Sequence, residues 1–174
     1  EASKKVTRLG IPFLKRLPRD IAYWWKRNRR LTAHLFKTIP VRKWKSIEFG
    51  GENLFGLLAG FTLARMSEEQ GIGHAHAPWA MGPATAAWVA SRLIGIPFSF
   101  TGRAGDIYPP DGALAEKLTD AEFIISENRT NVPYMAQFAP QAKDKIFPVY
   151  NGVPLEKHST APVVMKKPYQ ILAL

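Results

Sequence analysis

The chain has 174 residues, of which 46% are hydrophobic, and it carries a formal net charge of +10 at pH 7. A chain of this size and apolar content can form one folded domain with a sizeable core, which argues against wholesale disorder. The absence of cysteine excludes a disulfide scaffold and a thiolate metal site, and no apolar run reaches the roughly 18 residues of a transmembrane helix.

The basic residues are concentrated in the first part of the chain. Residues 1–50 contain fourteen Lys and Arg residues but three acidic residues, whereas the rest of the chain is close to neutral. Such asymmetry indicates an anionic partner, either lipid head groups or nucleic acid. No nucleic-acid-binding motif accompanies the charge, so nucleic acid is not expected as a partner.

An amphipathic helix is predicted within this basic region, over residues 21–37, with Asp20 as its N-cap. At about 100° per residue, its apolar and basic side chains fall on opposite faces. Two interpretations fit this pattern: the helix packs on the core of its own domain, or it contacts an anionic membrane surface with tryptophan at the interface. The predicted membrane-contact residues are Trp24, Trp25, Lys26, Arg27 and Arg30.

A second helix is predicted over residues 53–66, which are apolar on nearly every side but too few to span a bilayer. Gly56 and Gly60 lie four residues apart and favour the close approach of a neighbouring backbone. The pair Gly50 and Gly51 is interpreted as a turn before this helix, and residues 66–73 as a polar turn after it.

A strand–helix–strand unit follows and organises the rest of the chain. Residues 72–76 and 98–101 form apolar runs, and Gly82 with Pro83 opens a helix over residues 84–94, because the fixed φ of proline suits a first helical turn. Gly95 supplies the left-handed residue that ends the helix. Two strands joined by a helix in this way predict a parallel sheet.

The second half repeats this rhythm. Asp111 is predicted to cap a short helix over residues 112–118, and Asn131 with Pro133 opens a later helix that stops before Pro140. Further strands are predicted over residues 122–126 and 145–150, the latter at a sheet edge because Pro148 lacks a ladder donor. Asn151 and Gly152 form a turn, residues 154–168 read as a linker, and a new strand begins at residue 170.

Five short motifs in this order resemble the amino-terminal domain of retaining GT-B glycosyltransferases, specifically family four, also called glycosyl transferases group 1. The resemblance covers residues 70–174 and rests on His74-Ala-His76, Ile96-Pro-Phe-Ser-Phe-Thr101, Asp106-Ile-Tyr108, Ile124-Ile-Ser-Glu-Asn128 and Val149-Tyr-Asn-Gly-Val153.

The resemblance implies a fold class and a domain organisation. The fold is α/β, with a Rossmann-like parallel sheet flanked by helices and a helical basic segment before it. Residues 1–69 form that basic segment, residues 70–153 the Rossmann-like core, and residues 154–174 a linker with the first strand of a second domain. Because Glu1 is not a start residue and Leu174 ends an apolar run, we expect a fragment of a longer protein.

The resemblance also implies an activity. The intact enzyme would transfer a sugar from a nucleotide-sugar donor to a glycan or lipid-linked acceptor with retention, as in polysaccharide or lipopolysaccharide biosynthesis. No metal or other cofactor is expected, and the fragment alone should be inactive. The expected location is cytoplasmic, at the inner face of the cytoplasmic membrane. The competing hypothesis is a non-catalytic α/β module that binds an anionic membrane surface or another polyanion.

Three features depart from the family pattern. No strand with a glycine-rich loop precedes residue 70, and the domain that would bind the nucleotide-sugar is missing. Family members carry two histidines in the loop before the aspartate that matches Asp106, where this chain has Arg103 and Gly105. A guanidinium binds oxyanions bidentately, so Arg103 would meet a phosphate or carboxylate at this position.

The candidate substrate-binding residues lie where ligands bind in open parallel sheets, beyond the carboxyl ends of the strands. His74 and His76 alternate along a strand, so both point to one face and serve as cleft contacts, metal ligands or ordinary packed histidines. Asp106 is either a cap for loop amides or a cleft residue, and Glu127 either meets the acceptor or caps the next helix. No catalytic residue is nominated. The predicted cleft comprises His74, His76, Arg103, Asp106 and Glu127.

Overall fold

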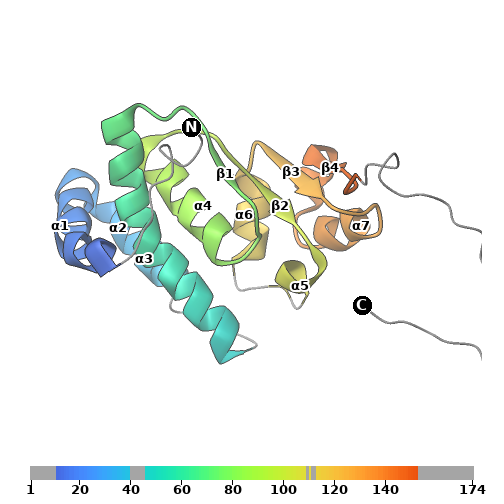
Figure 1. Cartoon of the computed structure of the whole chain (residues 1–174), viewed down its shortest axis with the longest axis horizontal. Helices are drawn as coiled ribbons and strands as arrows, with labels where there is room; N and C mark the ends of the chain where they lie inside the picture. The colour runs from blue at the N-terminus through green and yellow to red at the C-terminus, as the bar shows by residue number, and fades with distance from the viewer. Residues whose placement is uncertain (1–10, 40–45, 109, 111–112, 153–174) are drawn as a thin grey trace, which may run out of the picture.

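The protein is a mixed α/β structure built on a four-stranded sheet in which every strand is parallel to its neighbours (Figure 1). The computed structural model describes residues 11–39, 46–108, 110 and 113–152. The strands follow one another across the sheet in chain order as β1 (Ala75–Ala77), β2 (Phe98–Gly102), β3 (Phe123–Ser126) and β4 (Ile146–Pro148). The expected Rossmann-like arrangement of a parallel sheet with helices is therefore present.

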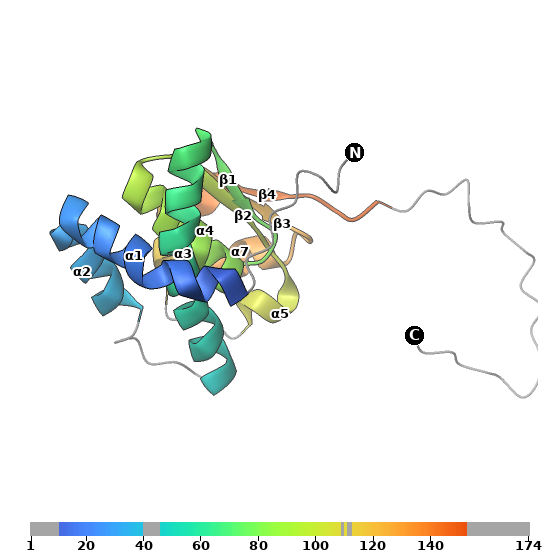
Figure 2. The same ribbon diagram turned by 60° about the vertical axis from the view of Figure 1, so that its left-hand side comes forward.

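Helices connect these strands and precede them. Before the sheet come α1 (Ile11–Arg27), α2 (Arg29–Thr38) and α3 (Ile47–Gln70). Between strands lie α4 (Gly82–Ile94), α5 (Ala104–Ile107), α6 (Leu114–Asp120), α7 (Asn131–Ala136) and the 3₁₀ helix η2 (Pro140–Lys145). Figure 2 shows α1 crossing α3, which in turn lies beside α4.

The basic segment forms two helices rather than the single predicted one. Asn28 interrupts it, because its side chain accepts a hydrogen bond from the amide of Leu31 and thereby caps α2. Asp20 is not an N-cap. It lies inside α1, is 1% exposed, and accepts a hydrogen bond of 2.8 Å from the hydroxyl of Thr62 on α3. The polar partner on α3 therefore explains a carboxylate in the buried face of a helix.

The helix predicted over residues 53–66 is longer than expected at both ends. Ser46 caps α3 by accepting from the amide of Phe49, so Gly50 and Gly51 are helical and the predicted turn there is wrong. The helix also continues to Gln70, through most of the predicted polar turn, and Gly71 ends it with a φ of 63°. Glycine adopts this left-handed backbone conformation at a lower cost in free energy than any other residue.

The close approach predicted at Gly56 and Gly60 is confirmed. A Cβ added to Gly60 would lie 2.5 Å from Cβ of Val89, and one added to Gly56 would meet the Gly82 carbonyl and lie 2.9 Å from Cβ of Thr85. These neighbours all belong to α4. The two glycines thus allow α3 and α4 to pack backbone against backbone.

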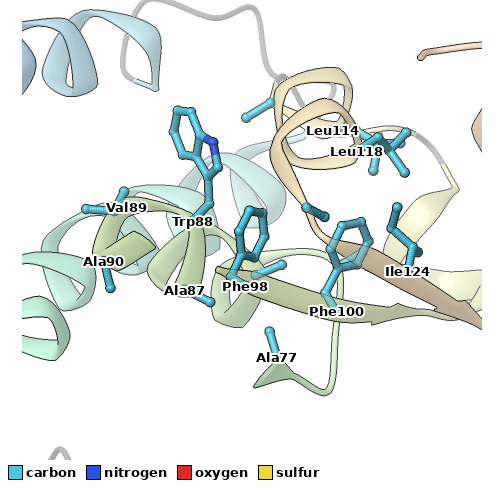
Figure 3. Close-up of a cluster of buried hydrophobic side chains, with 14 of the residues drawn as sticks. Ala77, Ala87, Trp88, Val89, Ala90, Phe98, Phe100, Leu114, Leu118 and Ile124 are labelled. Atoms are coloured by element: carbon cyan, nitrogen blue, oxygen red, sulfur yellow. The ribbon is translucent and has the colours of Figure 1, made fainter. Parts of the chain in front are cut away.

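The core lies on the face of the sheet that α4 and α6 cover (Figure 3). Phe98, Phe100 and Ile124 point into it from β2 and β3 and are fully buried. Trp88 of α4 packs above them, and its indole N–H donates a 2.8 Å hydrogen bond to Asp120. The predicted helix over residues 84–94, its opening proline and its Gly95 terminus are all confirmed.

The opposite face of the sheet is open within the described part of the chain. His76 is exposed, Phe123 and Ile125 are only partly buried, and the side chain of Phe147 on β4 is 52% exposed. Parallel sheets are normally covered on both faces. This open face is therefore the natural place for polar side chains that meet a ligand or another part of a protein.

The second half of the chain agrees with the predicted order of elements. Strand β4 lies at a sheet edge and ends at Pro148, as its missing amide donor predicts. Helix α6 begins after Ala113, while the predicted cap Asp111 lies outside the described residues, as do the linker and strand predicted over residues 154–174. Asn151 and Gly152 are exposed.

Candidate functional site

A row of polar side chains crosses the open face of the sheet. The register pairs His76 with Ser99 and Ser99 with Phe123, and further along it pairs Thr101 with Ile125. Because alternate residues of a strand share a face, the same register carries on to Arg103 and Glu127 just beyond the strand ends. The open face thus links two groups of candidate residues.

The first group surrounds the hydroxyl of Ser99. Nε2 of His74 and Nδ1 of His76 each lie 2.8 Å from this oxygen, and Nε2 of His76 lies 3.2 Å from the hydroxyl of Thr101. Both imidazole rings stack on Phe123, with centroids 5.7 and 6.3 Å away. The two histidines therefore share one face, as their alternation predicts, and they are held by packing and hydrogen bonds.

The position of His74 differs from the prediction in one respect. It precedes β1 at the amino end of the strand, where its Nδ1 lies 3.3 Å from the carboxylate of Glu122, at the start of β3. Ser99 is fully buried beneath the rings, so it is not accessible as a nucleophile. Burial lowers the pKa of His76 below its ordinary value, and the neighbouring His74 lowers it further. A neutral His76 suits a hydrogen-bonding role better than a charged one.

The second group lies at the carboxyl ends of the strands. The guanidinium of Arg103, which follows β2, sits over the ring of Trp79, 4.5 Å from its centroid. Its Nε lies 3.0 Å from Oε1 of Glu127, which follows β3, in an ion pair rather than a well-aligned hydrogen bond. The Asn151 amide reaches the same Glu127 oxygen at 3.5 Å. A cation, a carboxylate, an amide and an aromatic face therefore meet in one place.

Asp106 supports this group from beneath and is 3% exposed. One carboxylate oxygen accepts the amide of Ala80 at 2.6 Å, and the other accepts the amide of Arg103 at 2.7 Å. It thus ties the loop after β1 to the loop after β2. Of the two roles considered for Asp106, the structure shows the loop cap.

The five predicted site residues consequently fall into two groups. Arg103, Asp106 and Glu127 come together at the carboxyl ends, whereas His74 and His76 lie further back along the strands. Sequence reasoning missed Trp79 and Ser99. The signal for Trp79 was its place directly after Pro78, in the loop that leaves the first strand, and the signal for Ser99 was its register opposite His76.

Metal binding was one of the alternatives for the histidines. Within the described ranges, no group of three or more His, Asp and Glu side chains is placed to hold a metal ion. The histidine rings are instead occupied by Ser99, Thr101 and Phe123.

The predicted membrane-contact residues also separate. Trp24 is 1% exposed and its indole N–H donates a 3.0 Å hydrogen bond to the Phe61 carbonyl, so its assignment to a membrane surface is wrong. Trp25 is 40% exposed, with the guanidinium of Arg29 5.4 Å from its ring centroid. Arg27 donates to the hydroxyl of Tyr23 and to the carboxylate of Glu68, and these contacts raise its pKa.

Lys26 and Arg30 are exposed, as a surface role requires. Among the described helices, none combines the length and apolar character that crossing a bilayer demands.

No protein-family profile, no curated protein and no solved structure matches the chain.

Proposed function

We propose that the chain forms the acceptor-side domain of a retaining GT-B glycosyltransferase of family four. The observation that carries the proposal is the group formed by Trp79, Arg103 and Glu127 beyond the carboxyl ends of a parallel sheet. Ligands of open parallel sheets bind at this edge. Of this group, Glu127 belongs to a motif that resembles the family, as does Asp106 beside it, whereas Arg103 stands where the family has histidine.

The chemistry of the group suits a saccharide or a phosphorylated saccharide. An exposed indole offers a flat apolar surface to a sugar ring, while Glu127 accepts hydrogen bonds from hydroxyl groups. The guanidinium of Arg103 donates to hydroxyl, carboxylate or phosphate oxygens. Asp106 fixes the backbone from which Arg103 projects and so orients it without touching the ligand.

In the proposed reaction, the bond between the donor sugar's anomeric carbon and the nucleotide diphosphate breaks, and a bond to an acceptor hydroxyl oxygen forms on the same face. The proton of that hydroxyl passes to the departing diphosphate. No protein nucleophile is nominated, and the nucleotide-sugar would be held by a second domain. Helix N-termini and basic residues would carry the diphosphate charge without a metal ion.

We also propose that the protein binds peripherally to an anionic membrane surface on the cytoplasmic side. Along α1, the exposed residues Leu14, Pro18, Ala22 and Trp25 recur at helical spacing. Exposed basic residues flank them: Lys15, Arg19, Lys26, Arg29 and Arg30. An apolar stripe flanked by cations is the pattern of helices that lie in a membrane interface.

The same stripe favours the second candidate function, a non-catalytic module that binds an anionic membrane or other polyanion. The two functions differ in whether the group around Arg103 is required for chemistry.

The test uses the full-length gene product with a panel of nucleotide-sugars and a membrane lipid extract, and it measures release of the nucleoside diphosphate. We expect Arg103→Ala and Glu127→Gln each to lower the rate at least about tenfold, the loss typical of a removed charge-assisted contact in a transition state.

The control is Arg92→Ala, which removes an arginine paired with Asp120 away from the group. It should leave the rate unchanged. Absence of donor-dependent release with every nucleotide-sugar, alongside intact vesicle binding, would support the non-catalytic function instead.

A further inference from the structure

An apolar groove of about 790 Å³ opens beside the site, between the first half of α3, the loop after β1 and the start of α4. Its volume lies within the range of small-molecule sites, about 300–1,000 Å³. Two of the lining residues, Phe55 and Trp79, are large apolar side chains that are 54% and 46% exposed to solvent. Its lining includes Phe55, Ala59, Trp79, Met81, Pro83 and Ala86.

One side of the groove adjoins the basic helix. Phe13 of α1 meets the ring of Phe55 edge-on, with centroids 5.8 Å apart, and packs with the lining residues Ala59 and Ala86. The next residues of α1 are the exposed Leu14 and Lys15, which begin the stripe proposed to meet a membrane. The helix that carries this stripe therefore borders the groove through Phe13.

The start of α3 projects from the rest of the molecule (Figure 1). Ile47 is 95% exposed and Leu54 is 45% exposed on this part of the helix. Exposed apolar side chains that gather beside a groove mark a binding surface more often than an ordinary monomer surface.

The other side of the groove adjoins the polar group. Trp79 presents one part of its surface to the groove and carries the guanidinium of Arg103 over its ring. Arg103 in turn is paired with Glu127. The groove thus lies between α1, which is proposed to meet a membrane, and the ion pair of Arg103 and Glu127, which is proposed to bind the acceptor.

We propose that this groove binds the aliphatic chain of a lipid-linked acceptor, with the phosphate that joins chain and sugar near Arg103. The choice of acceptor rests on the proposed glycosyltransferase function, while the binding of an aliphatic chain rests on the groove alone. An aliphatic chain fits the observations because most of the lining is apolar, with Glu52 as its charged member, and because the guanidinium of Arg103 lies over Trp79 at the edge of the groove.

The experiment titrates the 174-residue chain with octyl, decyl and dodecyl phosphate below their critical micelle concentrations and measures each Kd by calorimetry. Each buried methylene should lower Kd about three- to fourfold, because its burial contributes about 0.8 kcal/mol. Arg103→Ala should raise the Kd of all three probes by a similar factor, because it changes the head-group contact alone.

Gly51→Leu supplies the decisive variant. Gly51 lines the groove, and a Cβ added there meets nothing within 4 Å, so a longer side chain enters the groove without displacing protein atoms. We expect this variant to bind dodecyl phosphate at least tenfold more weakly and to lose the dependence on chain length. Gly51→Ala is the matched control, because it makes the same change of helix propensity but fills little of the groove, and it should bind as the wild type does.

Two results would overturn the inference: a Kd that does not depend on chain length, or equal binding by Gly51→Leu and Gly51→Ala. A chain-length-independent result would mean that the phosphate binds while the aliphatic chain stays outside the groove. The titration contains no nucleotide-sugar, so its outcome is independent of the transferase assay, and a failure of either leaves the other result standing.

Discussion

Asp106 shows how one residue can matter to a site without meeting a ligand. Its two carboxylate oxygens accept the amides of Ala80 and Arg103, and these amides belong to loops that follow different strands. The carboxylate is almost fully buried, so water cannot replace it as an acceptor. The position of Arg103 over Trp79 therefore depends on this side chain.

Asp106→Ala should destabilise the fold, because it leaves the amides of Ala80 and Arg103 without their acceptors. A buried polar group left unpaired costs about 1–3 kcal/mol, so a loss of about 2–4 kcal/mol in the free energy of unfolding is expected. Urea denaturation of the 174-residue chain measures it. Asp106→Asn keeps one acceptor oxygen and should lose clearly less. Equal losses for Asn and Ala would show that the two amide bonds contribute little.

At the scale of elements, the contact between α3 and α4 holds the amino-terminal helices to the sheet. It depends on Gly56 and Gly60, where a side chain would enter the space of Gly82, Thr85 or Val89. Helix α4 in turn packs on β1 and β2. The spacing between these two helices therefore also sets one side of the apolar groove.

Gly60→Ala tests this contact against Gly51→Ala on the same helix. The methyl group at position 60 would lie 2.5 Å from Cβ of Val89, so overpacking of about 1–3 kcal/mol is expected. The methyl group at position 51 meets nothing, and the better helix propensity of alanine should stabilise the protein by about 0.5–1 kcal/mol. Thermal unfolding followed by circular dichroism should shift in opposite directions, and a shift in the same direction would contradict the packing.

At the scale of the whole molecule, the positive charge is concentrated in the first fifty residues, which include α1. The exposed side of α1 carries both apolar and basic side chains, whereas its buried side meets α3 through Trp24 and Asp20. The structure shows the first interpretation of the sequence, packing on the core, for one face of the helix, and membrane contact of the exposed face stays a prediction.

The membrane hypothesis predicts salt-dependent binding of the 174-residue chain to anionic vesicles. Lys15→Glu with Lys26→Glu should greatly reduce co-sedimentation, since each basic side chain near an anionic surface contributes about 1 kcal/mol. Arg129→Glu with Lys143→Glu makes the same change of net charge at exposed positions outside α1 and should bind more strongly than the α1 variant. Binding should weaken as salt rises, because the Debye length shrinks. Equal binding to neutral vesicles would exclude the electrostatic mechanism.

The sequence by itself determined the sheet and the helix that crosses over it. Strand positions agreed to within a few residues, and α4 was bounded correctly by Pro83 and Gly95. These signals are local: proline fixes its own φ, glycine tolerates a left-handed conformation, and short apolar runs separated by a helix must pair in parallel. The strand ends also placed Arg103 and Glu127 at one edge.

Only the tertiary structure decided which faces and ends meet. Trp24 and Trp25 differ by about 100° around α1, and the helical pattern assigns both to the apolar face. In the structure, Trp24 is the buried one, and its indole N–H donates to the carbonyl of Phe61 on α3. Gly50 and Gly51 are helical because Ser46 begins α3 earlier than local propensity indicates. His74 lies apart from Arg103 because β1 begins only at Ala75, which leaves His74 at the amino end of the sheet. For Trp24 and His74, partners distant in sequence determine the outcome, and no local pattern encodes those partners.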